Sequence, residues 1–177
     1  SVDGEMTLYS RDDEVFSTAE LNMGSGTSGL LVTEVKKRMH SASKDVDLAI
    51  IDGSPGIGCP VIASLNGVDM VLIVAEPSIS GINDMERIIL TARHFDIKVA
   101  VCINKYDLDH ETSAQIEEYC LKHDINVVGK IPFDEEVVKA LVKGEPLVSP
   151  GVMGGESESL AAKAVEQLWA EVLESLS

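Results

Sequence analysis

Residues 68–77 read VDMVLIVAEP, and residues 99–105 read VAVCINK. Both stretches are almost continuously apolar and rich in β-branched residues, a composition typical of parallel strands that are covered on both faces. Between them, residues 81–95 (GINDMERIILTARHF) carry apolar residues at helical spacing. Strand, helix and strand therefore follow one another as in a βαβ unit.

The same alternation continues on both sides of this unit. Residues 46–52 (VDLAIID) and 125–134 (INVVGKIPFD) are predicted as further strands, and residues 112–124 and 135–144 as further helices. The fold class that we expect is α/β, a doubly wound and mostly parallel sheet with helices on both faces.

The first 27 residues predict a different arrangement, a β-hairpin followed by a lead-in loop. Residues 6–10 and 15–21 are β-prone and flank the turn-forming pair Asp12 and Asp13. Residues 24–31 (GSGTSGLL) have the glycine spacing of a phosphate-binding loop, but Leu30 and Leu31 stand where that loop needs Lys and Ser or Thr. We interpret them as the approach to a helix with Ser28 as its N-cap.

The chain is predicted to form a single domain, with the βα core at residues 28–148 and a last helix at residues 157–176. This helix has one apolar face, and its polar face carries Glu166, Glu171 and Glu174 but only one lysine, Lys163. That charge is the wrong sign for an anionic lipid surface, so we expect the helix to pack on the sheet.

Composition excludes several classes of function. The 177 residues include 14 Lys and Arg against 30 Asp and Glu, a formal net charge of −16. Such a surface repels nucleic acids and anionic membranes, so neither is expected as a partner. No apolar run is long enough to span a bilayer, and a cytoplasmic protein is expected. The three cysteines are too widely spaced for a metal motif or a disulfide framework.

Ligands of open α/β sheets bind at the carboxyl ends of the strands, so the residues that follow each strand are the candidates for a site. Asp52 follows the strand predicted at residues 46–52, and a turn containing Gly56 comes next. A carboxylate there can hold a Mg²⁺-bound water, and a glycine N–H can contact a terminal phosphate. A plain helix cap would explain Asp52 equally well.

Three further strand ends follow. Glu76 and Pro77 predict a structural turn before a helix capped by Ser80 or Asn83. Asn104, Lys105 and Asp107 spell the Asn-Lys-x-Asp pattern of guanine recognition, in which the amide reads a purine edge and the lysine stem covers a base or ribose. The fourth strand ends in Pro132, Phe133 and Asp134, a possible far wall of a base pocket.

Four stretches in this order resemble the MinD/ParA/Mrp-type P-loop ATPases. They are residues 47–64 (DLAIIDGSPGIGCPVIAS), 67–88 (GVDMVLIVAEPSISGINDMERI), 101–108 (VCINKYDL) and 128–148 (VGKIPFDEEVVKALVKGEPLV). The likeness runs from about residue 24 to residue 148. It is greatest to the subgroup in which a ferredoxin-like domain with two 4Fe–4S clusters is inserted into the ATPase.

The resemblance implies roles for individual residues. Asp52 would end the Walker B strand and help to hold Mg²⁺ through water, and Gly56 would face the terminal phosphate. Asn104 would contact adenine, with Lys105 beside it, although relatives vary at Lys105 and Asp107. The turn formed by Pro132, Phe133 and Asp134 would close the adenine pocket.

The resemblance also implies parts that these 177 residues lack. The family's phosphate loop, the catalytic aspartate that follows it and both sets of cluster-binding cysteines are absent from the sequence. We expect them to lie before Ser1 in a full-length protein, a homodimeric, ATP-dependent switch with iron–sulfur or electron-transfer partners. On this interpretation the P-loop NTPase fold is incomplete here, and the isolated chain binds ATP weakly and hydrolyses it negligibly.

Two alternatives remain open at this point. A GTPase would use Asn104, Lys105 and Asp107, although Pro55 stands where the GTPase pattern after Asp52 needs glycine. A scaffold domain would have retained the loops of the sheet without any nucleotide chemistry.

Overall fold

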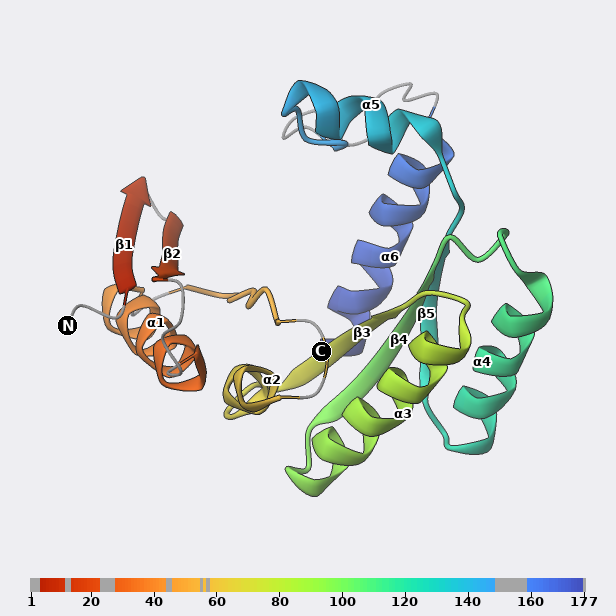
Figure 1. The fold of residues 1–177 in the computed structure, drawn as a ribbon, viewed down its shortest axis with the longest axis horizontal. Coiled ribbons are helices and arrows are strands. Elements are labelled where there is room, and N and C mark those ends of the chain that lie inside the picture. Colours follow the sequence, from red (N-terminus) through yellow and green to blue (C-terminus); the bar gives the residue numbers. More distant parts are fainter. Residues whose placement is uncertain are drawn as a thin grey trace. The chain divides into compact units, whose positions relative to one another are not determined.

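The computed structural model describes residues 4–11, 14–22, 28–43, 46–54, 56, 58–148 and 159–176. The chain divides into two compact units, Ser1–Val68 and Asp69–Ser177 (Figure 1).

The first unit contains a hairpin and two helices. These are β1 (Gly4–Arg11), β2 (Glu14–Leu21), α1 (Ser28–Ala42) and α2 (Cys59–Leu65). The two strands pair in antiparallel register from Gly4 opposite Leu21 to Arg11 opposite Glu14, as expected of a hairpin. Its turn, Asp12 and Asp13, lies outside the described residues. Helix α1 begins at Ser28, the residue expected to cap it, and the loop before it at residues 23–27 is also outside them.

Helix α1 contacts both β2 and α2. Ser17 Oγ of β2 donates a hydrogen bond to the Val35 carbonyl of α1 at 3.2 Å. A Cβ on Gly29 would lie 3.3 Å from the Cys59 Cβ, so this glycine allows the two helices to approach closely. Helix α2 was not predicted from the sequence, although Pro60 in its first turn is a typical start signal.

Lys36 of α1 caps the last turn of α2. Its ammonium donates hydrogen bonds to the carbonyls of Ala63, Ser64 and Asn66 at 3.2, 2.9 and 2.6 Å. These carbonyls are among those that a helix C-terminus leaves without partners, and a cation there interacts favourably with the helix dipole. Burial lowers the pKa of Lys36 below its ordinary value of 10.5.

The prediction of a strand at residues 46–52 is wrong. This segment is extended but pairs with no strand in the described part of the chain, and the side chains of Val46, Leu48 and Ile50 are 41%, 41% and 71% exposed. A strand is stable only when its backbone groups find hydrogen-bond partners on a neighbouring strand, and apolar composition alone supplies none.

The second unit is a parallel α/β layer structure. Its elements are β3 (Met70–Ala75), α3 (Ile79–His94), β4 (Lys98–Asn104), α4 (His110–Lys122), β5 (Asn126–Ile131), α5 (Glu135–Lys143) and α6 (Leu160–Leu176). The strands form one sheet in the order β3-β4-β5, and both pairings are parallel. The α/β fold with a parallel sheet and helices is therefore confirmed.

Helices cover both faces of this sheet, as Figure 1 shows. Val101 and Ile103 of β4 pack with α3 and α4 in one buried cluster, whereas Ala100 and Cys102 pack with Leu168 and Val172 of α6 in another. Successive side chains of a strand point to opposite faces, so β4 contributes to both clusters. Its continuous apolar run, read from the sequence, reflects this double burial.

Two details of the helices differ from expectation. Ser78 caps α3, accepting a hydrogen bond from the Gly81 N–H at 3.0 Å, instead of Ser80 or Asn83. In α6, Leu168 and Val172 are buried as expected of an apolar face, but Ala161 and Ala162 are buried as well, whereas Leu160 is 65% exposed. Small side chains are preferred where a helix lies close to its neighbours, and an exposed leucine at a helix start is common.

Helices α3 and α4 end in the same way. Each is followed by an aspartate in the left-handed conformation, Asp96 at φ 57° and Asp124 at φ 55°. The next residue is a buried isoleucine whose N–H donates back to the last turn, Ile97 to Ala92 at 3.0 Å and Ile125 to Cys120 at 2.9 Å. This is the Schellman type of helix end, and it turns the chain directly into the next strand.

Candidate functional site

The end of β4 carries the first group of candidate residues. Asn104 is the last residue of the strand, and it is half-buried. It pairs with Ile131 of β5, the residue before Pro132. The sheet register thus places Asn104 beside the turn formed by Pro132, Phe133 and Asp134, and these sequence-predicted residues are brought together.

Lys105 follows at φ 53°, a left-handed conformation that is uncommon for a residue with a side chain. Such conformations cost about 1–2 kcal/mol and cluster at sites where the surrounding structure imposes them. Lys105 is therefore held in a specific orientation at the end of the sheet.

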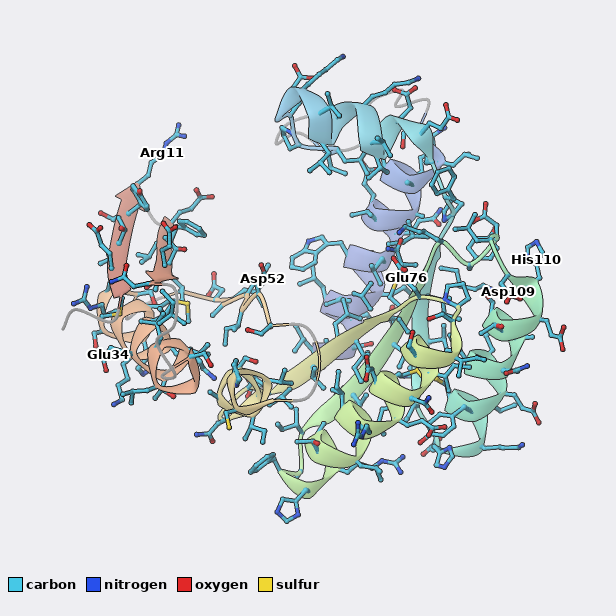
Figure 2. All side chains as sticks on the ribbon, in the orientation of Figure 1. Arg11, Glu34, Asp52, Glu76, Asp109 and His110 are labelled. Atoms are coloured by element: carbon cyan, nitrogen blue, oxygen red, sulfur yellow. The ribbon has the colours of Figure 1, made fainter. Side chains whose placement is uncertain are left out.

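Glu76 is the partner of Lys105. The ammonium of Lys105 lies 2.7 Å from Glu76 Oε1, and both side chains are about half exposed. Ala75 pairs with Ile103, so Glu76 is the next residue out on the neighbouring strand. Figure 2 shows Glu76 at the end of β3, towards the same end of the unit as Asp109 at the start of α4.

The turn after β3 folds back closely. A Cβ on Gly81 would lie 2.3 Å from the Glu76 carbonyl oxygen, a contact that no side chain tolerates. Only glycine at position 81 lets α3 begin this near to Glu76.

The loops after β4 and β5 are joined by two hydrogen bonds. The Tyr106 N–H donates to the Ile131 carbonyl at 3.2 Å, and the Phe133 N–H donates to Asp107 Oδ1 at 2.7 Å. The Ser113 hydroxyl of α4 donates to the Tyr106 carbonyl at 2.7 Å, which fixes that residue from the other side. Asp107, the fourth residue of the Asn-Lys-x-Asp pattern, thus connects the loop after β4 to the loop after β5.

Asp134 caps α5 and also binds the start of α6. Its Oδ1 accepts from the Glu136 N–H at 2.9 Å, and its Oδ2 accepts from the Ser159 hydroxyl at 2.7 Å and the Ala161 N–H at 3.2 Å. These bonds, that of Glu136 foremost, lower the pKa of Asp134 below its ordinary value of 3.8. Both carboxylate oxygens are therefore occupied within the protein.

Asp52 and Gly56 belong to the first unit, and the other candidates belong to the second. The Asp52 carboxylate is exposed, and no hydrogen bond or ion pair to another described residue engages it (Figure 2). Gly56 has φ 84°, a conformation that favours glycine, and a Cβ there would meet no atom of the described residues within 4 Å. A carboxylate that no other described residue engages is compatible with Mg²⁺, which binds through one or two carboxylates and several waters.

The cysteines do not fit an iron–sulfur cluster. Cys102 and Cys120 are buried in the clusters on opposite faces of the sheet, and Cys59 is in the other unit. Burial raises the pKa of both buried thiols to about 11, so they are protonated at neutral pH and poor metal ligands. Within the described ranges, no group of three or more His, Cys, Asp or Glu side chains could hold a metal ion.

Sequence reasoning missed the parts played by Glu76 and Asp107. The signal for Glu76 was its position, because the ends of neighbouring parallel strands meet at one edge of the sheet. No comparable signal existed for Asp107, whose partner Phe133 is 26 residues away.

Comparisons with known proteins find MinD and uncharacterized ATP-binding proteins among the relatives of this chain. The chain is 28% identical over 119 residues to the septum site-determining protein MinD of Bacillus subtilis, a match that covers 64% of this chain and 44% of MinD. It is also 28% identical over 140 residues to an uncharacterized ATP-binding protein of Methanocaldococcus jannaschii, covering 79% of this chain and 50% of that protein. No protein-family model matches the sequence.

Solved structures agree with the sequence relatives. The cell division ATPase MinD of Pyrococcus furiosus superposes with a TM-score of 0.63 at 21% identity, over 84% of this chain and 59% of that one. The chain therefore shares the fold of the part of MinD that it matches. MinD of Pyrococcus horikoshii, solved in complex with Mg-ADP, superposes with a TM-score of 0.64 at 21% identity, over 81% of this chain and 56% of that one.

The similarity to MinD covers only part of each relative. The chain spans about half the length of the curated relatives it matches.

In the part of the chain that the structure describes, no helix is both long and apolar enough to cross a membrane.

Proposed function

We propose that this chain is part of an ATP-dependent switch protein of the MinD/Mrp type and supplies two portions of its nucleotide site. The observation that carries the proposal is the arrangement at the ends of β4 and β5, where Asn104 and Lys105 adjoin the turn at Pro132 and Phe133. In a parallel α/β sheet, this edge is where ligands bind.

The base side of the site consists of Asn104, Lys105 and this turn. The Asn104 amide both donates and accepts hydrogen bonds, as an adenine edge requires. The Lys105 stem covers the base or ribose, while its ammonium stays with Glu76. Pro132 is half-buried and Phe133 is 45% exposed, so both present apolar surface to a base. Asp134 acts here through its backbone and its caps, because its carboxylate is already engaged.

The metal side of the site consists of Asp52 and Gly56. Asp52 would hold Mg²⁺ through a bound water, and the Gly56 N–H would face the terminal phosphate. Bound Mg²⁺ neutralises the charge that develops on the phosphate oxygens during hydrolysis. The exposed carboxylate of Asp52, which no other described residue engages, is suited to this role.

The phosphates themselves need a loop that this sequence does not contain. After Gly24 and Gly29, the Lys and Ser/Thr positions hold Leu30 and Leu31, and both lie in α1. After Gly53 and Gly58, which have the same spacing, these positions hold Cys59 and Pro60. We therefore place the phosphate loop outside these residues in the intact protein, and we expect the chain alone to hydrolyse ATP negligibly.

An iron–sulfur association and a homodimer complete the proposal. The clusters would be bound by cysteines outside this chain, since those described here do not fit one. Anaerobic purification of the intact protein, followed by iron and sulfide analysis and measurement of its mass in solution with and without ATP, tests both. A preparation free of iron would contradict the iron–sulfur association. A mass in solution that ATP leaves unchanged would contradict an ATP-dependent homodimer.

The central experiment compares Mg²⁺-ATP and Mg²⁺-GTP binding by the intact protein with that of two variants. Asn104→Ala should weaken ATP binding by about tenfold, the size expected for losing a buried hydrogen-bonded contact. Asp52→Ala should abolish the dependence on Mg²⁺. Asn83→Ala, an exposed asparagine of α3, is the matched control and should bind as wild type does.

The outcomes separate the candidate functions. A strong preference for GTP would favour a GTPase that uses Asn104, Lys105 and Asp107. If the intact protein binds neither nucleotide, both nucleotide-dependent functions are contradicted and the scaffold domain is favoured.

A further inference from the structure

Asp107 is the side chain that joins the loop after β4 to the loop after β5. The Phe133 N–H donates to its Oδ1 at 2.7 Å across 26 residues of sequence. The bond from Tyr106 to Ile131 lies beside it and joins the same two loops. Without Asp107, the Tyr106 bond would be the one that still joins these two loops among the described residues.

A carboxylate that reads guanine has a different task. Guanine presents two adjacent donors on its Watson–Crick edge, N1–H and the 2-amino group, and a carboxylate receives them with both oxygens. Adenine has an acceptor at N1 and a single 6-amino donor, so it makes no such pair. Asp107 Oδ1 is already occupied by the Phe133 N–H. To read guanine, Asp107 would have to share that oxygen or release the turn.

The Lys105 side chain is also engaged by another residue of the protein. Its ammonium is paired with Glu76 at 2.7 Å. Two of the three polar side chains in the Asn-Lys-x-Asp pattern are therefore engaged by the protein, and the third, Asn104, has no side-chain hydrogen bond to another described residue.

We infer that Asp107 is a positioning residue that fixes the Phe133 turn beside Asn104 and so makes the site prefer adenine over guanine. This inference rests on the proposed function, because it concerns the same site. Asp107 does not touch the base, and it acts through the backbone of Phe133.

Three variants isolate this role. Asp107→Ala removes the acceptor, whereas Asp107→Asn keeps an oxygen that can accept from the Phe133 N–H. Asp109→Ala is the matched control, two residues away. Asp109 accepts hydrogen bonds from Thr112 N at 3.0 Å and Thr112 Oγ1 at 2.7 Å, and these lie within the first turn of α4.

The first measurement is amide hydrogen exchange at Phe133, which needs no nucleotide. Exchange should be faster by about tenfold or more in Asp107→Ala, since the amide loses its acceptor. Asp107→Asn and Asp109→Ala should exchange at Phe133 as the wild type does. Equal rates in all four proteins would overturn the inference.

The second measurement is the ratio of the GTP and ATP dissociation constants of the intact protein. Asp107→Ala should lower this ratio about tenfold, by weakening ATP binding more than GTP binding. Asp107→Asn should restore most of it, and Asp109→Ala should leave it unchanged. A loss of protein stability alone would weaken the binding of both nucleotides to the same extent, so the ratio of the dissociation constants would not change.

The outcomes distinguish this inference from the proposed function. If the wild type binds ATP and the ratio is the same in Asp107→Ala, the specificity role is wrong while the proposed function stands. If the wild type binds neither nucleotide, the proposed function fails and the inference fails with it.

Discussion

The ammonium of Lys105 lies 2.7 Å from the carboxylate of Glu76, and these residues follow neighbouring strands of one parallel sheet. The lysine is also held at φ 53°. An ion pair and a strained backbone thus coincide at the edge of the sheet where α/β proteins bind their ligands. This combination is typical of a functional site, because strain persists where the surrounding structure imposes it.

Replacing Lys105 by glycine should make the protein more stable. Glycine adopts φ 53° without a steric penalty, so the unfolding free energy should rise by up to about 1 kcal/mol, less the small contribution of an exposed ion pair. Chemical denaturation measures this. The same change should weaken nucleotide binding in the intact protein.

Asp96→Gly is the matched control for that variant. Asp96 has φ 57° and follows α3, away from the strand ends that form the candidate site. It should show a similar gain in stability with unchanged nucleotide affinity. A loss of affinity in Asp96→Gly as large as that in Lys105→Gly would contradict a special role for Lys105.

Lys36→Met should destabilise the first unit. The variant keeps the aliphatic stem but leaves the carbonyls of Ala63, Ser64 and Asn66 without their donor. The expected loss is about 1–2 kcal/mol of unfolding free energy. Lys37→Met is the control, because Lys37 is exposed and its contact with Glu34 is 3.9 Å long. It should change stability by less than about 0.5 kcal/mol.

Gly129→Ala should weaken the packing of α6 on the sheet. A Cβ at position 129 would lie 2.9 Å from Leu168 Cδ1 and 3.2 Å from its Cβ. Overpacking of this kind costs about 1–3 kcal/mol. In a Leu168→Ala background the same substitution should cost less, because the clash is removed. Additive effects of the two changes in thermal denaturation would argue against direct contact.

Asp134→Asn should produce a pH-dependent loss of stability. The hydrogen bonds to Asp134 lower its pKa in the folded protein, so its contribution is fully present above its ordinary pKa of 3.8 and is lost as pH falls through the folded value. The variant should be less stable than the wild type at neutral pH, and the difference should shrink below about pH 4. Thermal melts across this range measure the difference.

Ser159→Ala provides the internal check on that result. Ser159 donates to Asp134 at 2.7 Å and accepts from the Ala162 N–H at 3.1 Å. Because the two residues share a hydrogen bond, the double variant should lose less stability than the sum of the single variants. A pH-independent gap between Asp134→Asn and the wild type would show that these bonds do not depend on the charge.

Much of the second unit could be predicted from the sequence. The three strands and the helices between them were expected within a few residues of their observed bounds, since double burial leaves a continuous apolar run that is visible in any single strand. The hairpin of residues 4–21 was equally readable, from two β-prone runs around a turn.

The segment at residues 46–52 shows where such prediction fails. Its composition is that of a buried strand, but the described residues offer it no partner, and Ile50 is 71% exposed. Strand formation depends on a neighbour's hydrogen-bonding groups, which no local pattern records.

The sequence alone therefore determined the parallel α/β class, the candidate residues at the strand ends and the likeness to MinD-like ATPases. Tertiary structure alone decided how those residues are used: Lys105 pairs with Glu76, Asp107 holds the turn at Phe133, and Asp134 joins α5 to α6. The physical reason is that each of these contacts joins residues at least 25 positions apart. Spacing along the chain reveals what a segment becomes, whereas the partner of a polar group depends on which segments the fold brings together.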